Sequence, residues 1–127
     1  MKRLSAICLA AALVSGCATV DRLNGTKCAT TADGMTAVES VQVMNTNWLL
    51  LSFIPLASGD PTQPDTATCR AFRNTVTLQN QLDMLDAEAK RVGATKAVNV
   101  ETAYTDERVL FFLLLSEKML TSATLVK

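Results

Sequence analysis

Hydrophobic and polar residues alternate along two stretches of the chain, which predicts two β-strands that each have one solvent-facing side. The stretch 37–44 sets Val41 and Val43 between polar neighbours. The stretch 97–104 alternates in the same way, with its valines at even positions. Strand pairs of this kind build a sheet that needs cover on one face only.

Two further runs, 48–56 and 109–115, are apolar on both sides, which is typical of short buried strands. Residues 119–126 form a last β-like segment. The predicted strands are separated at 45–47 (NTN) and 105–108 (TDER), whose residue types are common in turns.

The spacing of apolar residues predicts one helix, over about 77–92. Its apolar positions recur at intervals of four and three residues on one face: Leu78, Leu82, Leu85, Ala89 and Val92. Thr75 or Thr77 is placed to cap the start, and Gly93 sits where a left-handed C-terminal cap belongs.

These elements predict an α+β fold in the order strand, strand, helix, strand, strand, strand. A helix with one apolar face needs a sheet to cover it, so we expect a single antiparallel or mixed β-sheet with the helix on one face. The runs 48–56 and 109–115 carry more apolar surface than one helix covers. Burial on both sides and a surface for self-association both remain open as explanations.

The N-terminal residues have the organisation of an export signal, because Lys2 and Arg3 precede an apolar run. The run is too short to span a membrane, which takes about 20 residues. It ends on four residues that resemble the lipobox of bacterial lipoproteins: Val14, Ser15, Gly16 and Cys17. In that family the signal is removed and the cysteine thiol carries a diacylglycerol with palmitate-type acyl chains.

The lipobox resemblance implies a signal peptide at 1–16, a lipidated N-terminus and tether at 17–34, and a single small domain at 35–127. It also implies attachment to the membrane of the bacterial cell envelope through lipid on Cys17. Because Ala18 rather than aspartate follows the cysteine, the periplasmic face of the outer membrane is favoured over the inner membrane.

Composition excludes several classes of function. Removing residues 1–16 leaves 111 of the 127 residues, enough for one domain, with 10 basic against 12 acidic residues. No basic stripe remains, so nucleic-acid binding has no electrostatic support. The chain has no histidine, which removes the commonest general base and metal ligand. We therefore expect no catalytic residue, no metal site and no cofactor.

Two cysteines, Cys28 and Cys69, remain besides Cys8 of the signal and Cys17. In the oxidising envelope the natural prediction is a Cys28–Cys69 disulfide, closing a loop of about 40 residues. Two free or intermolecular thiols are the alternative.

A second resemblance covers about 25 residues, the predicted helix and the junction 93–100 (GATKAVNV). This unit is similar to the helix-to-strand junction of the YbjQ-like family, which implies a compact α+β fold that assembles in rings. The family is named for heavy-metal binding, but that property does not carry over to a chain without histidine. The combination with the lipobox resembles small bacterial lipoproteins.

Two functions fit these observations. The first is a non-enzymatic envelope lipoprotein, a structural or protein-interaction module whose partner is an envelope protein or a second copy. The alternative is a module that binds a small apolar ligand or lipid between helix and sheet. Other candidate chemistry is weak, because Asp60 and Asp65 fit a solvated loop better than a calcium site, and Ser116 with Lys118 lacks an oxyanion-hole motif.

Overall fold

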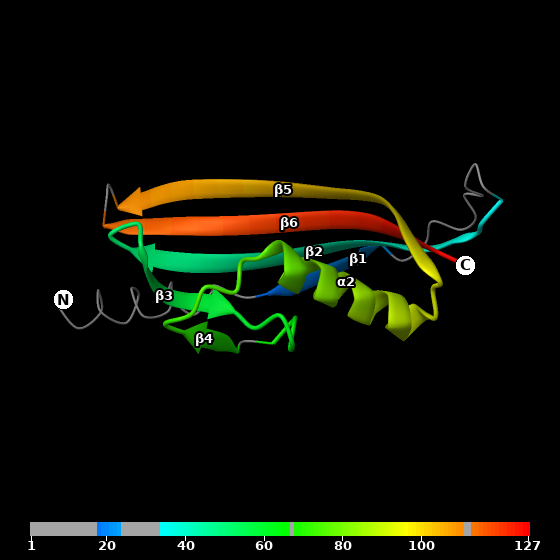
Figure 1. Ribbon diagram of the computed structural model, residues 1–127, viewed down its shortest axis with the longest axis horizontal. Helices are drawn as coiled ribbons and strands as arrows, with labels where there is room; N and C mark the ends of the chain where they lie inside the picture. The colour runs from blue at the N-terminus through cyan, green and yellow to red at the C-terminus, as the bar shows by residue number, and fades with distance from the viewer. Residues whose placement is uncertain (1–17, 24–33, 67, 111–112) are drawn as a thin grey trace.

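The structure is a computed structural model that describes residues 18–23, 34–66, 68–110 and 113–127. Six strands form one antiparallel sheet, and a single helix packs on one face of it (Figure 1). The predicted α+β architecture, with one helix on an antiparallel sheet, is therefore confirmed. The number of strands and their boundaries differ from the prediction.

The strands and the helix are named in chain order. They are β1 (Thr19–Leu23), β2 (Ala37–Leu50), β3 (Ile54–Gly59), β4 (Cys69–Ala71), α2 (Leu78–Val92), β5 (Lys96–Leu110) and β6 (Leu114–Val126). The sheet order is β4-β3-β2-β6-β5, and β1 also pairs with β2. Because β6 pairs along the whole length of β2, β1 and β3 lie one after the other along its opposite edge.

The turn predicted at 45–47 is wrong, because β2 runs straight through it. Asn45 and Asn47 are both fully buried. The Asn45 amide donates to the carbonyl of Thr75 at 2.8 Å, and the Asn47 amide donates to the Glu117 carboxylate at 3.1 Å. Asparagine is tolerated inside a buried strand when other elements supply such partners, and sequence cannot show those partners.

The turn predicted at 105–108 is also wrong, so the three strands expected after the helix are two long ones, β5 and β6. β5 lies at the edge of the sheet, and residues 99–109 are exposed on both of its faces. Polar residues can continue an edge strand of this kind because their side chains remain in water. Of the run 109–115, residues 111 and 112 lie outside the described part.

Two short strands were not predicted. β1 falls within the segment 17–34 that was expected to be a tether, and β4 follows the proline-rich loop. Strands of five and three residues are too short to show a periodic pattern. Their pairing partners, β2 and β3, stabilise them instead.

The helix prediction is confirmed at both ends. Thr77 is the N-cap, and its hydroxyl accepts a hydrogen bond from the backbone N–H of Asn80 at 3.3 Å. Gly93 is the C-cap, with the left-handed φ of 65° that a side chain would disfavour. Local sequence chemistry is sufficient to set these boundaries.

The predicted apolar face of the helix is confirmed in its second half, where Leu85 is buried and Ala89 and Val92 pack against the core. In its first half the buried face is rotated: Leu78 and Leu82 are 52% and 40% exposed, and the fully buried positions of the helix are Gln81, Met84, Leu85 and Glu88. Two of the buried side chains are polar and have partners: the Gln81 amide donates to the carbonyl of Met119 at 3.0 Å, and Glu88 pairs with two arginines. Apolar spacing alone could not reveal a buried stripe that contains glutamine and glutamate.

The core lies between α2 and the sheet, in two clusters of buried residues. One contains Ala18, Val20, Val43 and Met84, and the other contains Val41, Leu85, Ala123 and Leu125. The first cluster joins β1 to the helix, and the second joins the helix to β2 and β6. The other face of the sheet is covered by no described element and carries half-buried side chains of mixed polarity: Ser40, Gln42, Met44, Leu120 and Ser122.

Candidate functional site: an apolar tip and a charged clasp

The predicted lipobox residues Val14, Ser15, Gly16 and Cys17 lie outside the described residues, as does Cys28. The first described residue is Ala18, which is 1% exposed and packs in the core. Thr19 then pairs with Met44, and β1 runs antiparallel to β2. The domain therefore begins within two residues of the predicted lipidation site.

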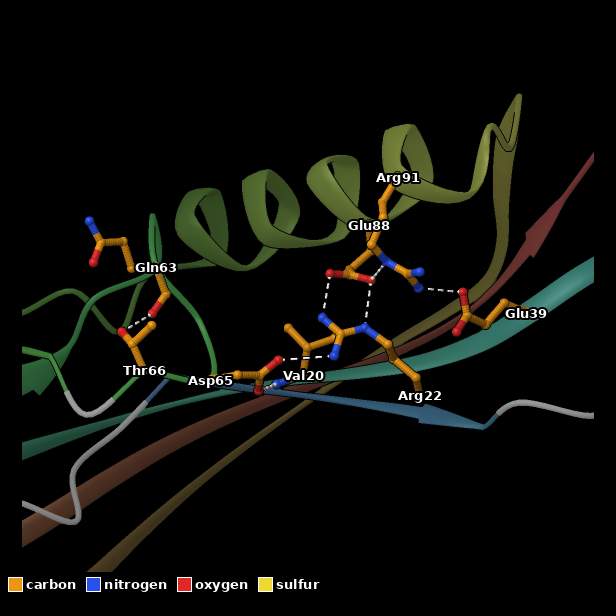
Figure 2. A network of polar contacts seen from close by, with 8 residues as sticks. All are labelled: Val20, Arg22, Glu39, Gln63, Asp65, Thr66, Glu88 and Arg91. Atoms are coloured by element: carbon orange, nitrogen blue, oxygen red, sulfur yellow. Dashed lines mark hydrogen bonds and ion pairs between the residues drawn. The ribbon is translucent and has the colours of Figure 1, made fainter.

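β1 is fastened to the helix by a network of charged side chains that we call the clasp: Arg22, Glu39, Asp65, Glu88 and Arg91 (Figure 2). The Arg22 guanidinium donates two hydrogen bonds to the Glu88 carboxylate, at 2.8 and 3.0 Å. Arg91 donates to Glu88 and to Glu39, both at 2.7 Å. Three elements that are distant in sequence, β1, β2 and α2, are held at this point.

Charge pairing in the clasp favours the ionised form of Glu88 and Arg22 and outweighs their burial. Glu88 and Glu39 are each 5% exposed. The hydrogen bond from Arg22 lowers the pKa of Glu88 below its usual range, and Arg91 adds to this, although burial of the carboxylate acts in the opposite direction. Glu88 in turn raises the pKa of Arg22. The Arg22–Glu88 pair thus remains charged at neutral pH.

Asp65 extends the clasp to the loop before β4. One of its carboxylate oxygens accepts from the Val20 amide at 2.8 Å, and the other pairs with Arg22 at 3.0 Å. The Asp65 amide donates to the carbonyl of Ala18 at 2.9 Å. Asp65 was considered from sequence as a weak calcium ligand, and the structure gives its carboxylate these contacts with β1 instead.

A second feature gathers exposed apolar side chains at one end of the sheet, where the β2–β3 and β5–β6 hairpins turn (Figure 1). We call it the apolar tip and define it by six residues that are between 37% and 75% exposed: Leu51, Phe53, Ile54, Phe72, Val109 and Leu113. The apolar runs that suggested buried strands divide here. Leu49 and Leu115 are buried, whereas Leu51, Phe53 and Leu113 are exposed.

The two hairpins are joined, because the Leu51 amide donates to the carbonyl of Leu113 at 2.9 Å. The β2–β3 turn has left-handed φ angles at Leu51 (53°) and Ser52 (67°), and the Phe53 amide donates back to Leu50 at 3.3 Å. Turns of this type favour Asn-Gly, since leucine is disfavoured at positive φ. The conformation of the turn therefore does not explain why position 51 is a leucine.

Basic residues lie directly behind the apolar tip. Arg73 follows Phe72 in sequence, and Arg108 pairs with Leu115 about two strand positions, or roughly 7 Å, from the turn. Both arginines are exposed. Glu107 is one residue farther back and pairs with Lys118 at 3.9 Å.

Cys69 is exposed at the start of β4. Cys69 pairs with Gly59 of β3, which lies level with Thr46 of β2. Leu23 is five residues before Cys28 and pairs with Ser40 of β2. The separation of six strand positions is about 20 Å along the sheet. Five residues span at most about 17 Å and a disulfide joins Cα atoms at most about 7 Å apart, so a bridge would need nearly full extension. The Cys28–Cys69 disulfide stays a prediction.

The remaining candidates have ordinary contacts or none. Asp60 pairs with Arg70 at 3.1 Å and accepts from Thr62 within its own loop. The Ser116 hydroxyl is buried without a partner among the described residues, and the Lys118 ammonium lies near Glu107. In the described part of the chain, no three His, Cys, Asp or Glu side chains gather as metal ligands, and no helix has the length and apolarity to cross a membrane.

Comparison with protein families, curated proteins and solved structures found no match for this chain. The lipobox and YbjQ-like resemblances therefore stay predictions. The two apolar runs in the sequence indicated the segments that form most of the apolar tip. Nothing in the sequence indicated that these residues would be exposed. The clasp had none, because Arg22 and Glu88 are separated by 66 residues.

Proposed function

We propose that this chain is a lipid-anchored lipoprotein of the bacterial envelope, most simply on the periplasmic face of the outer membrane, and that it works as a structural or protein-interaction module. The observation that carries the proposal is the sequence Val14-Ser15-Gly16-Cys17 behind a basic and apolar leader. Two or three acyl chains on Cys17 would hold the chain firmly, since one alone binds only marginally.

The arrangement of β1 supports this proposal. A lipid anchor positions a domain only if the domain is connected to it by a short segment, and here a core residue, Ala18, directly follows Cys17 in sequence. The ion pairs of Arg22, Glu88 and Arg91 connect β1 to the helix and to β2, so a force applied at the N-terminus would be resisted by all three elements. The domain would stand directly on the membrane surface.

Mass spectrometry of the full chain produced in a bacterium tests the proposal. We expect loss of residues 1–16 and added mass equal to a diacylglycerol with an N-terminal acyl chain. The Cys17→Ser chain is the matched control and should keep its leader and gain no lipid. An unmodified mature N-terminus at residue 17 would contradict the proposal.

The apolar-ligand alternative has a specific place in the fold. A hollow of about 390 Å³ lies between α2 and the start of β5, with a lining that includes Leu82, Leu85, Ala89, Ala94 and Ala97. Its volume is at the lower end of the range for small-molecule sites. Native mass spectrometry of protein purified from cells would show a retained ligand as extra mass beyond the anchor, and a bare chain would count against this alternative.

A further inference from the structure

We infer that the apolar tip enters the acyl region of the bilayer to which the protein is anchored. The domain would then be held in a defined orientation by protein as well as by lipid. The inference rests on the proposed function for the nature of the nearby membrane. It adds a second contact, made by side chains, that a lipid anchor on Cys17 does not require.

The position and exposure of the tip favour a bilayer over a small ligand. Its residues lie at the ends of two hairpins and directly after β4, and each of the six is at least 37% exposed. Phe53 is 70% exposed and Phe72 is 75% exposed. The segment 45–59 contains no charged residue. Exposed apolar patches of this kind mark membrane or protein contacts.

The direction of the chain places the tip on the membrane side of the domain. Thr19 pairs with Met44, and β2 continues from Met44 toward the tip, ending at Leu50 about 20 Å farther on. β1 runs the opposite way, so Thr19, at its N-terminal end, is the residue of β1 nearest the tip end of the sheet (Figure 1). The C-terminal residue Lys127 lies at the far end, hydrogen-bonded to Thr36.

Exposed charged residues of both signs lie behind the tip. Arg108 and Glu107 are roughly 7 Å or more from the β5–β6 turn, a spacing that would set their charged groups at headgroup depth while the apolar side chains lie deeper, and Arg73 adds an exposed basic residue directly after Phe72. A second copy docked tip to tip would leave these arginines at least about 14 Å apart, where salt screens their repulsion. The bilayer is the better occupant because the described chain begins, next to the predicted lipid anchor, on the tip side of β1.

Tryptophan fluorescence in brominated lipid tests the inference. The full chain is purified from a bacterium with its native modification and placed in vesicles of equal parts phosphatidylcholine and phosphatidylglycerol, the former with brominated acyl chains. Phe53→Trp and Leu23→Trp are each made in a Trp48→Phe chain. Phe53 and Leu23 are 70% and 69% exposed, and they lie toward opposite ends of the sheet, so they form a matched pair.

For a residue buried 5–10 Å into the boundary, we expect bromine to remove about half or more of the F53W emission and little of the L23W emission. Equal quenching of the two chains would overturn the inference, and so would a blue-shifted F53W emission that bromine does not quench, because a protein contact would then cover the tip. If the Trp48→Phe chain does not fold, both substitutions are made with Trp48 present and its quenching is subtracted.

The mass of the same samples separates this inference from the proposed function. A lipidated chain with unquenched F53W emission retains the anchor and refutes tip insertion. A chain without lipid whose F53W emission is quenched refutes the anchor and supports tip insertion.

Discussion

Replacing Glu88 by glutamine tests whether the clasp holds β1 on the helix. The change keeps the shape of the side chain and removes its charge. Glu88 accepts two hydrogen bonds from Arg22 and one from Arg91, and it is 5% exposed. Glutamine keeps one acceptor oxygen, but its amide group would point N–H toward a guanidinium. At least one charge-assisted bond is therefore lost and replaced by opposed donors.

The magnitude follows from the exposure of the partners. A hydrogen bond to a charged group contributes about 1.5–3 kcal/mol, and breaking a fully buried ion pair costs about 3–5 kcal/mol. The Arg22 and Arg91 side chains are 31% and 46% exposed, so water recovers part of this loss. They also keep Asp65 and Glu39 as partners. We expect E88Q to lower the free energy of unfolding by about 2 kcal/mol, or the melting temperature by about 10 °C.

The effect must depend on pH in one direction. The pKa of Glu88 is lowered in the folded protein, chiefly by Arg22, so the folded state binds fewer protons than the unfolded state between the folded-state pKa and the unfolded value of about 4.3. The stabilisation is fully present above that pH and is lost as the pH falls through the folded-state pKa. The difference between the parent chain and E88Q should therefore be constant from pH 7 to about 5 and shrink at lower pH.

Urea denaturation followed by Trp48 fluorescence measures these values. Glu107→Gln is the matched control, because the Glu107 side chain is 69% exposed and its pair with Lys118 is at 3.9 Å; we expect less than about 0.5 kcal/mol. Arg22→Met, alone and with E88Q, completes a double-mutant cycle. The clasp has no role in stability if E88Q unfolds within 0.5 kcal/mol of the parent at pH 7. A loss that persists unchanged to pH 2 would exclude an electrostatic origin.

Three further predictions use simpler measurements. Thr77→Ala should lower the free energy of unfolding by about 1 kcal/mol by removing the N-cap, and Thr77→Ser should restore most of it; equal stability of the three chains would show that the cap contributes nothing. Met84→Ala should cost about 2–5 kcal/mol, and Leu82→Ala about 1 kcal/mol or less, whereas the reverse order would favour the helix face predicted from sequence. Thiol titration of unreduced protein should find neither Cys28 nor Cys69 reactive, because the predicted bridge consumes both thiols; two reactive thiols without reductant would refute the bridge, which the structure allows only with a nearly extended segment before Cys28.

Some of the fold could be predicted because its determinants are local. The helix from Leu78 to Val92 has both caps in the adjacent sequence, Thr77 and Gly93, and each acts through its own backbone and side chain. The alternating stretches likewise predicted strands in the region of β2 and the first half of β5. Short-range periodicity and capping need no knowledge of distant residues.

Strand length and helix orientation could not be predicted for the opposite reason. Asn45 resembles a turn residue until Thr75, 30 residues away, accepts from its amide. Gln81 resembles a surface residue until the carbonyl of Met119 accepts from it. Most polar side chains inside a protein have a hydrogen-bond partner, and sequence spacing does not identify partners from other elements.

The sequence by itself determined the α+β class, the limits of the helix and the prediction of a lipid-bearing Cys17 at the start of the mature chain. Only the tertiary structure decided that the apolar runs end in an exposed tip, and that Arg22 meets Glu88 to form the clasp. The physical reason is that exposure and ion pairing depend on which surfaces meet after folding. A run of leucines is equally compatible with a core and with a surface until the sheet determines where the strand ends.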